Sequence, residues 1–193
     1  MLSSDDVLFA IARACDRKVV GRTMIQKIGY FIGIKAGADL GYHPHYYGPY
    51  SPTVAATLEE RVGCVHFRET PHQSAEAFVG HDGTRKYYEY ELSDEGDKAA
   101  EIHRNWHPEE FDEAVEIAKE IQSLQANYMQ LSFAAKVHCI AVQRSRPFTV
   151  TLADIQASAR EFGWAMTKSD VAKGVEILEK LRLVTKRKRG QRA

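Results

Sequence analysis

Two pairs of histidines have the spacing closest to a metal site in this 193-residue chain. His43 and His45 alternate, so on a strand both would project to one face, while His103 and His107 stand four apart, a spacing that can hold zinc on a helix. Neither pair has an evident carboxylate or cysteine partner in the sequence, and a stable site needs a third ligand. We therefore expect no metal ligands and no cofactor.

Motifs for covalent or phosphate chemistry are missing from the sequence. It contains no Gly-x-Ser-x-Gly, no Walker loop and no Gly-x-Gly-x-x-Gly. Gly80-His81-Asp82-Gly83 is typical of a hairpin loop rather than of a nucleophile's surroundings. We expect a protein that is not an enzyme and has no catalytic residues.

Composition indicates a cytoplasmic protein. No apolar run approaches the ~20 residues of a membrane span, and the N-terminal residues lack the positive flank of a signal peptide. Cys15, Cys64 and Cys139 are far apart and odd in number, which predicts reduced, buried thiols.

Charge is distributed unevenly along a chain whose net charge is zero. Lys and Arg minus Asp and Glu give +1 for residues 1–63, −4 for 64–104, −5 for 105–130 and +8 for 131–193. Such asymmetry indicates separate surfaces with separate partners, and a basic segment is typical of nucleic-acid binding.

The basic C-terminal third contains a candidate DNA-reading helix, predicted from Ser169 to Leu181. Lys168 and Ser169 lie at its start and Lys173 one turn on, where polar groups reach phosphates or base edges. The run Lys186, Arg187, Lys188, Arg189 would then bind phosphate with salt-dependent affinity. The alternative is a solvated amphipathic helix with a basic tail that aids solubility.

A two-part cassette lies in the N-terminal half: Gly21-Arg22-Thr23-Met24-Ile25-Gln26-Lys27-Ile28-Gly29-Tyr30 and His45-Tyr46-Tyr47-Gly48-Pro49-Tyr50-Ser51-Pro52. Thr23 and Gln26 have the spacing of a capping pair and predict a helix from Thr23 to about Lys35. Glycines recur every fourth residue at 29, 33 and 37, which predicts a close neighbour on that face. Ser51 and Pro52 predict the start of the next helix.

This cassette resembles the prokaryotic winged-helix proteins typified by YwgA and, more distantly, the Panacea (SocA-type) antitoxin domain. The matching residues are Gly-Arg-Thr-x-x-Gln-Lys-x-x-Tyr and Tyr-Tyr-Gly-Pro-Tyr-Ser-Pro, and the resemblance covers roughly residues 1–100. It implies a winged-helix fold and a binding module, since the antitoxin domain binds protein toxins or acts as an adaptor.

The cassette region supplies a second set of candidate residues. Nucleic-acid contacts are predicted at a helix start and along the outer face of the next helix, with one more in the wing, at Arg22, Thr53, Thr57, Arg61 and Arg85. Residues 64–104, which include the predicted wing, carry a net charge of −4, and this negative charge would repel DNA. Tyr46, Tyr47 and Tyr50 are the predicted partner-binding residues if exposed; otherwise Arg22 and the tyrosines are satisfied locally.

The predicted fold class is mainly α with small antiparallel β wings, as two winged-helix-like units joined by a long helix. Residues 1–104 form the first unit, 105–130 the connecting helix and 131–193 the second unit with its basic tail. Helices are expected from about Ser4 to Cys15 and after Ser93, with strands near Val65–Phe67 and over Lys86–Leu92. In the second unit, capping pairs predict helices after Thr151 and Thr167, and a strand is predicted over Leu183–Thr185.

The long helix is predicted to open at Pro108, with an apolar seam at Phe111, Ala114, Ala118, Ile121, Gln125 and Tyr128. This seam could pack within the chain or form a homodimer.

The leading functional hypothesis is double-stranded DNA binding, in transcription regulation or in a defence operon. The alternative is a protein-interaction module of antitoxin or adaptor type that uses the tyrosine-rich cassette.

Overall fold

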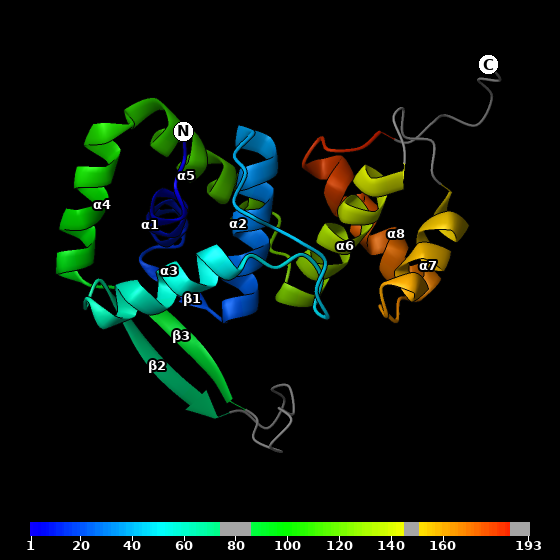
Figure 1. Cartoon of the computed structure of the whole chain (residues 1–193), viewed down its shortest axis with the longest axis horizontal. Helices are drawn as coiled ribbons and strands as arrows, with labels where there is room; N and C mark the ends of the chain where they lie inside the picture. Colours follow the sequence, from blue (N-terminus) through cyan, green and yellow to red (C-terminus); the bar gives the residue numbers. More distant parts are fainter. Residues whose placement is uncertain (74–85, 145–150, 186–193) are drawn as a thin grey trace. The chain divides into compact units, whose positions relative to one another are not determined.

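A computed structural model describes residues 1–73, 86–144 and 151–185. The chain divides into two compact units: the first unit takes in residues 1–43 and 50–125, and the second unit residues 44–49 and 126–193. The described residues form helices and one small antiparallel sheet (Figure 1), so the predicted mainly α class with a small β component is confirmed.

The first unit has the element order of a winged helix. Its strands form an antiparallel sheet in the order β1-β3-β2, with Tyr90 of β3 paired to Val19 on one side and Glu69 on the other. The elements of this unit are α1 (Ser4–Ala14), β1 (Lys18–Val20), α2 (Arg22–Ala36), α3 (Pro52–Gly63), β2 (Phe67–Gln73), β3 (Lys86–Leu92), α4 (Asp94–Trp106) and α5 (Pro108–Ser123).

Helix α1 is the centre of the first unit's core. Six consecutive residues, 7–12, are buried on all sides because α2, α3, α4 and α5 all pack against this helix. A helix surrounded in this way is apolar all round rather than on one face. Ser3 and Asp6 close its N-terminus as a capping box.

Helix α5 packs within the first unit. Phe111, Ala114, Ala118 and Ile121 of the predicted seam are buried, and the helix contacts α1 and α2. It ends at Ser123, so the seam does not continue to Tyr128, which instead begins α6.

The predicted capping pair at Thr23 and Gln26 is wrong. Helix α2 begins one residue earlier, its N-cap is Gly21 with a φ of 92°, and no side chain caps it. Gln26 is buried and used elsewhere: its Oε1 accepts from the Ser51 amide at 2.9 Å, and its Nε2 donates to the Ser51 carbonyl at 3.1 Å. The side-chain amide thus pairs with both backbone groups of one residue, as a neighbouring strand would.

Ser51, held by Gln26, also fixes the start of the next helix. As predicted, it is the N-cap of α3, and its Oγ accepts from the Val54 amide at 3.0 Å. The same Oγ donates to the Leu40 carbonyl at 2.5 Å, while the Tyr42 hydroxyl donates to the Gln26 carbonyl at 3.0 Å. The connection between α2 and α3 is therefore fixed to both helices.

The glycine face of α2 accommodates this connection, as predicted. A Cβ at Gly29 would lie 2.6 Å from the Tyr42 hydroxyl, and a Cβ at Gly33 would lie 3.0 Å from the Ala38 carbonyl oxygen. Gly37 ends the helix in the left-handed conformation that glycine adopts without steric cost.

The second unit is built on three helices: α6 (Tyr128–Arg144), α7 (Leu152–Glu161) and α8 (Lys168–Lys180). The predicted capping boxes Thr151–Asp154 and Thr167–Asp170 both form. Helix α8 packs closely on α6, because a Cβ at Gly174 would lie 2.9 Å from the backbone of Phe133.

The strand predicted over residues 183–185 is not formed. Arg182 has a φ of 58°, and the Leu183 amide donates back to the Leu178 carbonyl at 2.9 Å. These bonds close the C-terminus of α8 in the manner of a left-handed helix cap. The Leu183 amide is therefore already used and cannot join a sheet ladder.

The structure also bears on two other predictions, one on membrane spans and one on the cysteines. Within the described ranges, every helix is too short or too polar to cross a bilayer. All three cysteines are free, but only Cys139 is buried; Cys64, at the end of α3, is exposed, so its predicted burial is wrong.

Replacing Gln26 by Ala is expected to lower the free energy of unfolding by about 2 to 4 kcal/mol, since each buried backbone group left unsatisfied costs about 1–3 kcal/mol. Urea denaturation followed by circular dichroism measures this loss. Glu113→Ala, on the exposed side of α5, is the control and should change stability by about 0.5 kcal/mol or less. Equal stability of the two variants would contradict the role given to Gln26.

Candidate nucleic-acid interface

The first turns of α8 carry the best-placed candidate residues. Lys168, Ser169 and Lys173 are all exposed, while Val171, Gly174, Ile177 and Leu178 are buried against the rest of the second unit. Residues 162–167 join α7 to α8, and the two helices pack on each other. The sequence therefore placed these three polar side chains correctly on the outer face of α8.

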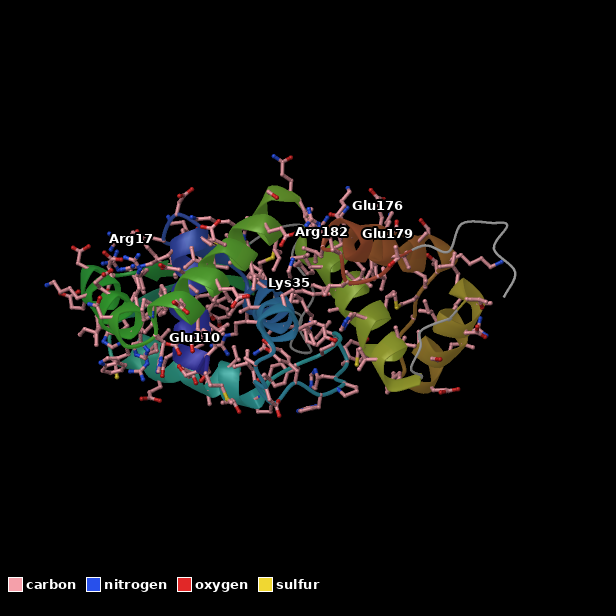
Figure 2. The ribbon with its side chains drawn as sticks, turned by 90° about the horizontal axis from the view of Figure 1, so that it is seen from above. Arg17, Lys35, Glu110, Glu176, Glu179 and Arg182 are labelled. Carbon is pink, nitrogen blue, oxygen red and sulfur yellow. The ribbon has the colours of Figure 1, made fainter. Side chains whose placement is uncertain are left out.

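The C-terminal end of α8 differs from its start. Lys180 is paired with Glu176 at 2.9 Å, and Glu176, Glu179 and Arg182 gather at this end of the helix (Figure 2). Positive and negative charges offset one another there. At the start of the helix the exposed Lys168 and Lys173 outnumber one acid, Asp170, which takes part in the capping box.

A turn from the cassette also belongs to the second unit. Tyr46 and Tyr47 occupy the two central positions of a β-turn, which the Gly48 amide closes on the His45 carbonyl at 2.9 Å. The same carbonyl accepts a second hydrogen bond, at 2.7 Å, from Nε1 of Trp164. We call residues 45–48 the tyrosine turn.

Trp164 connects the tyrosine turn to the start of α8. Its side chain is 1% exposed, it stacks on Phe162 at 4.9 Å between centroids, and the Lys136 ammonium lies 5.5 Å from its ring centroid. Burial lowers the pKa of Lys136, and the charge of Asp170 in α8 opposes this shift. Trp164 precedes Lys168 by four residues, so this hydrogen bond links the tyrosine turn to the segment that leads into α8.

The three tyrosines predicted to bind a partner are not equivalent. Tyr46 is 69% exposed and Tyr47 44% exposed, with their rings edge to face at 4.8 Å. Tyr50 belongs to the first unit, is half-buried, and pairs through its backbone with His43. Only Tyr46 and Tyr47 present a substantial surface.

The candidates in the first unit are largely engaged. Arg22 donates to the Tyr90 hydroxyl at 2.6 Å, to Glu69 at 3.0 Å and to Glu59 at 3.2 Å. Burial and the hydrogen bond to Glu69 raise the pKa of Tyr90, so its hydroxyl stays protonated and donates to that carboxylate. Arg22 is thus satisfied by local acids, which was the alternative to phosphate binding.

Helix α3 does not present the predicted reading face. Thr53 is exposed as expected, but Thr57 is 9% exposed and bonds the Thr53 carbonyl at 2.9 Å, so its predicted outward position is wrong. Arg61 is held by Asp5 through two hydrogen bonds, at 2.5 and 3.2 Å. The remaining exposed charges of the helix are Glu59 and Glu60.

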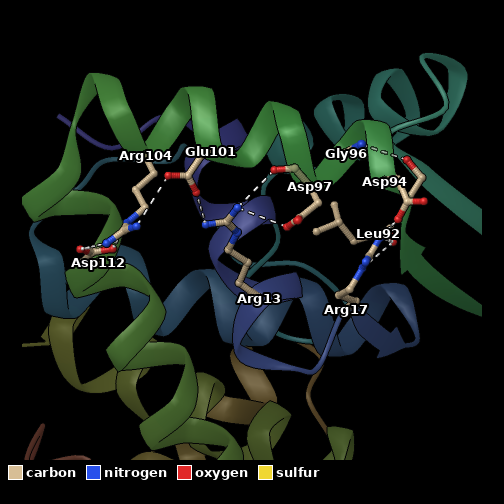
Figure 3. A network of polar contacts seen from close by, with 10 residues as sticks. Arg13, Arg17, Leu92, Asp94, Gly96, Asp97, Glu101, Arg104 and Asp112 are labelled. Carbon is tan, nitrogen blue, oxygen red and sulfur yellow. Dashed lines mark hydrogen bonds and ion pairs between the residues drawn. The ribbon is translucent and has the colours of Figure 1, made fainter.

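Other arginines of the first unit are also paired with acids, in a network of α1, α4 and α5 (Figure 3). Arg13 bonds Glu101 at 2.9 Å and Asp97 at 3.2 Å, and Arg104 bonds Asp112 at 2.8 Å. Arg17 donates to both the Leu92 carbonyl and Asp94. These arginines stabilise contacts between elements rather than forming a cationic surface.

The histidine pairs do not assemble a metal site in the described residues, where no three metal-ligating side chains come together. His103 Nδ1 lies 2.8 Å from Asp6 Oδ1. Burial opposes ionisation of Asp6, but hydrogen bonds from Ser3 and His103 hold its pKa below the ordinary value. His103 therefore has a structural partner in α1.

Several predicted residues lie outside the described residues, namely Arg85, Lys186, Arg187, Lys188 and Arg189. One residue of the site, Trp164, was not predicted from the sequence. Its partner His45 is 119 positions away, and no periodic or motif pattern connects residues so distant.

Comparison with known proteins adds no relative. No protein-family model matches this chain, and a search of curated proteins finds no match.

Replacing Trp164 by Phe is expected to loosen the tyrosine turn, because phenylalanine is aromatic but smaller than the indole and cannot donate to the His45 carbonyl. Hydrogen–deuterium exchange should show faster exchange at the Gly48 amide, with little change in helices α6 and α8. Trp106→Phe is the matched control, since Trp106 is 64% exposed and lies in the first unit. Unchanged exchange at Gly48 in the Trp164 variant would contradict this anchoring.

Proposed function

We propose that this protein binds double-stranded DNA through its second unit, with the first turns of α8 as the reading element. The observation that carries the proposal is the division of charge between the units. Residues 1–43 and 50–125 contain 13 Lys and Arg against 21 Asp and Glu, a net charge of −8, whereas residues 44–49 and 126–193 contain 13 against 5, a net charge of +8. DNA affinity depends strongly on positive charge near the phosphates.

The form of the second unit supports the same proposal. A helix-turn-helix places the N-terminal residues of its second helix against base edges in the major groove. In α8 these positions hold Lys168, Ser169 and Lys173, whose exposed side chains can donate to phosphates or bases. The residues at 186–193 add five further cations to this unit by sequence.

The first unit is less suited to DNA even though it has the winged-helix order. The exposed charges of its α3 are acidic, and both Arg22 and Arg61 are paired with carboxylates. Breaking these pairs to contact phosphate would leave acids facing a polyanion. In this proposal the first unit therefore does not contact DNA. Such DNA binding would serve to regulate transcription or a defence operon.

The double variant Lys168→Ala/Lys173→Ala is expected to weaken binding to a labelled duplex, measured by fluorescence anisotropy at several salt concentrations. Each lost phosphate contact removes about one released counterion, so the slope of log K against log salt should become shallower by about 2. Lys98→Ala/Lys119→Ala removes the same charge from the first unit and is the matched control. Absence of duplex binding by the unaltered protein at low salt would refute the proposal.

A further inference from the structure

The second unit lacks a described wing beside its helix-turn-helix. Residues 183–185, predicted as a strand, do not form one, and the Leu183 amide instead closes the end of α8. In a winged helix, the segment beside the reading helix provides backbone contacts that fix the protein on the duplex. The described part of this unit offers another segment near the same place, the tyrosine turn.

We propose that the tyrosine turn is a second DNA-contacting element, in which the hydroxyls of Tyr46 and Tyr47 donate to backbone phosphates beside the groove read by α8. This inference rests on the proposed function. It adds a phosphate-binding role for two neutral side chains that the sequence analysis had assigned to a protein partner.

Distance permits both segments to contact one duplex. The path from Lys168 to Tyr46 consists of four residues back to Trp164, its indole, the hydrogen bond to the His45 carbonyl and one peptide unit. Standard backbone dimensions limit this path to about 25 Å. That is less than the ~34 Å rise of one turn of B-form DNA. The two segments can therefore contact the same or adjacent turns of the phosphate backbone.

The turn also presents its tyrosines in a defined way. The His45 carbonyl is held by the Gly48 amide and by Trp164, so the turn is fixed at its base. Tyr46 and Tyr47 at its centre are 69% and 44% exposed. Positions fixed in advance lose less entropy on binding than side chains on a flexible loop.

Charge favours nucleic acid over protein as the occupant. Residues 44–49 carry no acidic side chain and belong to the unit with a net charge of +8. Tyrosine hydroxyls are common donors to phosphate oxygens in protein–DNA complexes. A polyanion that is attracted to this unit therefore meets hydrogen-bond donors on a turn whose own residues include no carboxylate.

The test measures duplex binding of the full chain with the double variant Tyr46→Phe/Tyr47→Phe. It keeps both rings and removes both hydroxyls. We expect a loss of affinity of roughly tenfold or more for each phosphate contact, the lower end of the range for hydrogen bonds to charged groups. The salt slope should not change, because neutral donors release no counterions. Tyr87→Phe/Tyr88→Phe, on β3 of the first unit, is the matched control and should bind as the unaltered protein does.

The possible failures are distinct. If the unaltered protein binds duplex but the Phe variant binds equally well, the phosphate role is wrong while the proposed function stands. Loss of binding only in Tyr46→Ala/Tyr47→Ala would indicate stacking by the rings and would also overturn the hydroxyl contact. A protein partner lost with the alanine variant while DNA affinity is kept would assign the turn to protein binding. No duplex binding by any form would remove the proposed function itself.

Discussion

The pairing of Gln26 with the backbone of Ser51 is the interaction on which the first unit's arrangement depends. One buried amide satisfies the amide and carbonyl of Ser51, and Ser51 in turn caps α3 and bonds Leu40. The segment between α2 and α3 can lie this close only because Gly29 and Gly33 have no side chain. The two halves of the cassette are therefore one structural device, which positions α3 against α2.

The division of charge gives the two units different capacities. In the first unit, acids pair with Arg13, Arg22, Arg61 and Arg104 and so stabilise its internal contacts. Partly exposed ion pairs of this kind each contribute modestly to stability, and they place a carboxylate beside each of these arginines. In the second unit the lysines at the start of α8 stay exposed. In the proposed function, the element order of the first unit therefore does not identify the DNA-binding unit.

Local signals in the sequence were reliable where local physics decides the outcome. Ser51, Thr151 and Thr167 cap helices as predicted, because capping involves residues only three positions apart. Thr23–Gln26 has the same spacing, yet it fails because Gln26 gains more from a buried partner 25 residues away. Spacing alone cannot show which partner a side chain will choose.

The candidate site was partly predictable for the same reason. The exposed face of α8 followed from helical periodicity, while the outward position of Thr57 did not, since contacts with Ser4 from another helix bury it. The bond between Trp164 and His45 depends on the folded chain and has no sequence signature. It changes the view of the tyrosines, because it ties their turn to Trp164, four residues before the start of α8.

The most direct test of this account is an NMR titration of the isotope-labelled full chain with a short duplex at low salt. The account predicts that amide shifts concentrate at the start of α8 and in the tyrosine turn, while α3, β2 and β3 keep their resonance positions. Shifts concentrated in α3 and its adjoining strands, or no shifts at all, would contradict it.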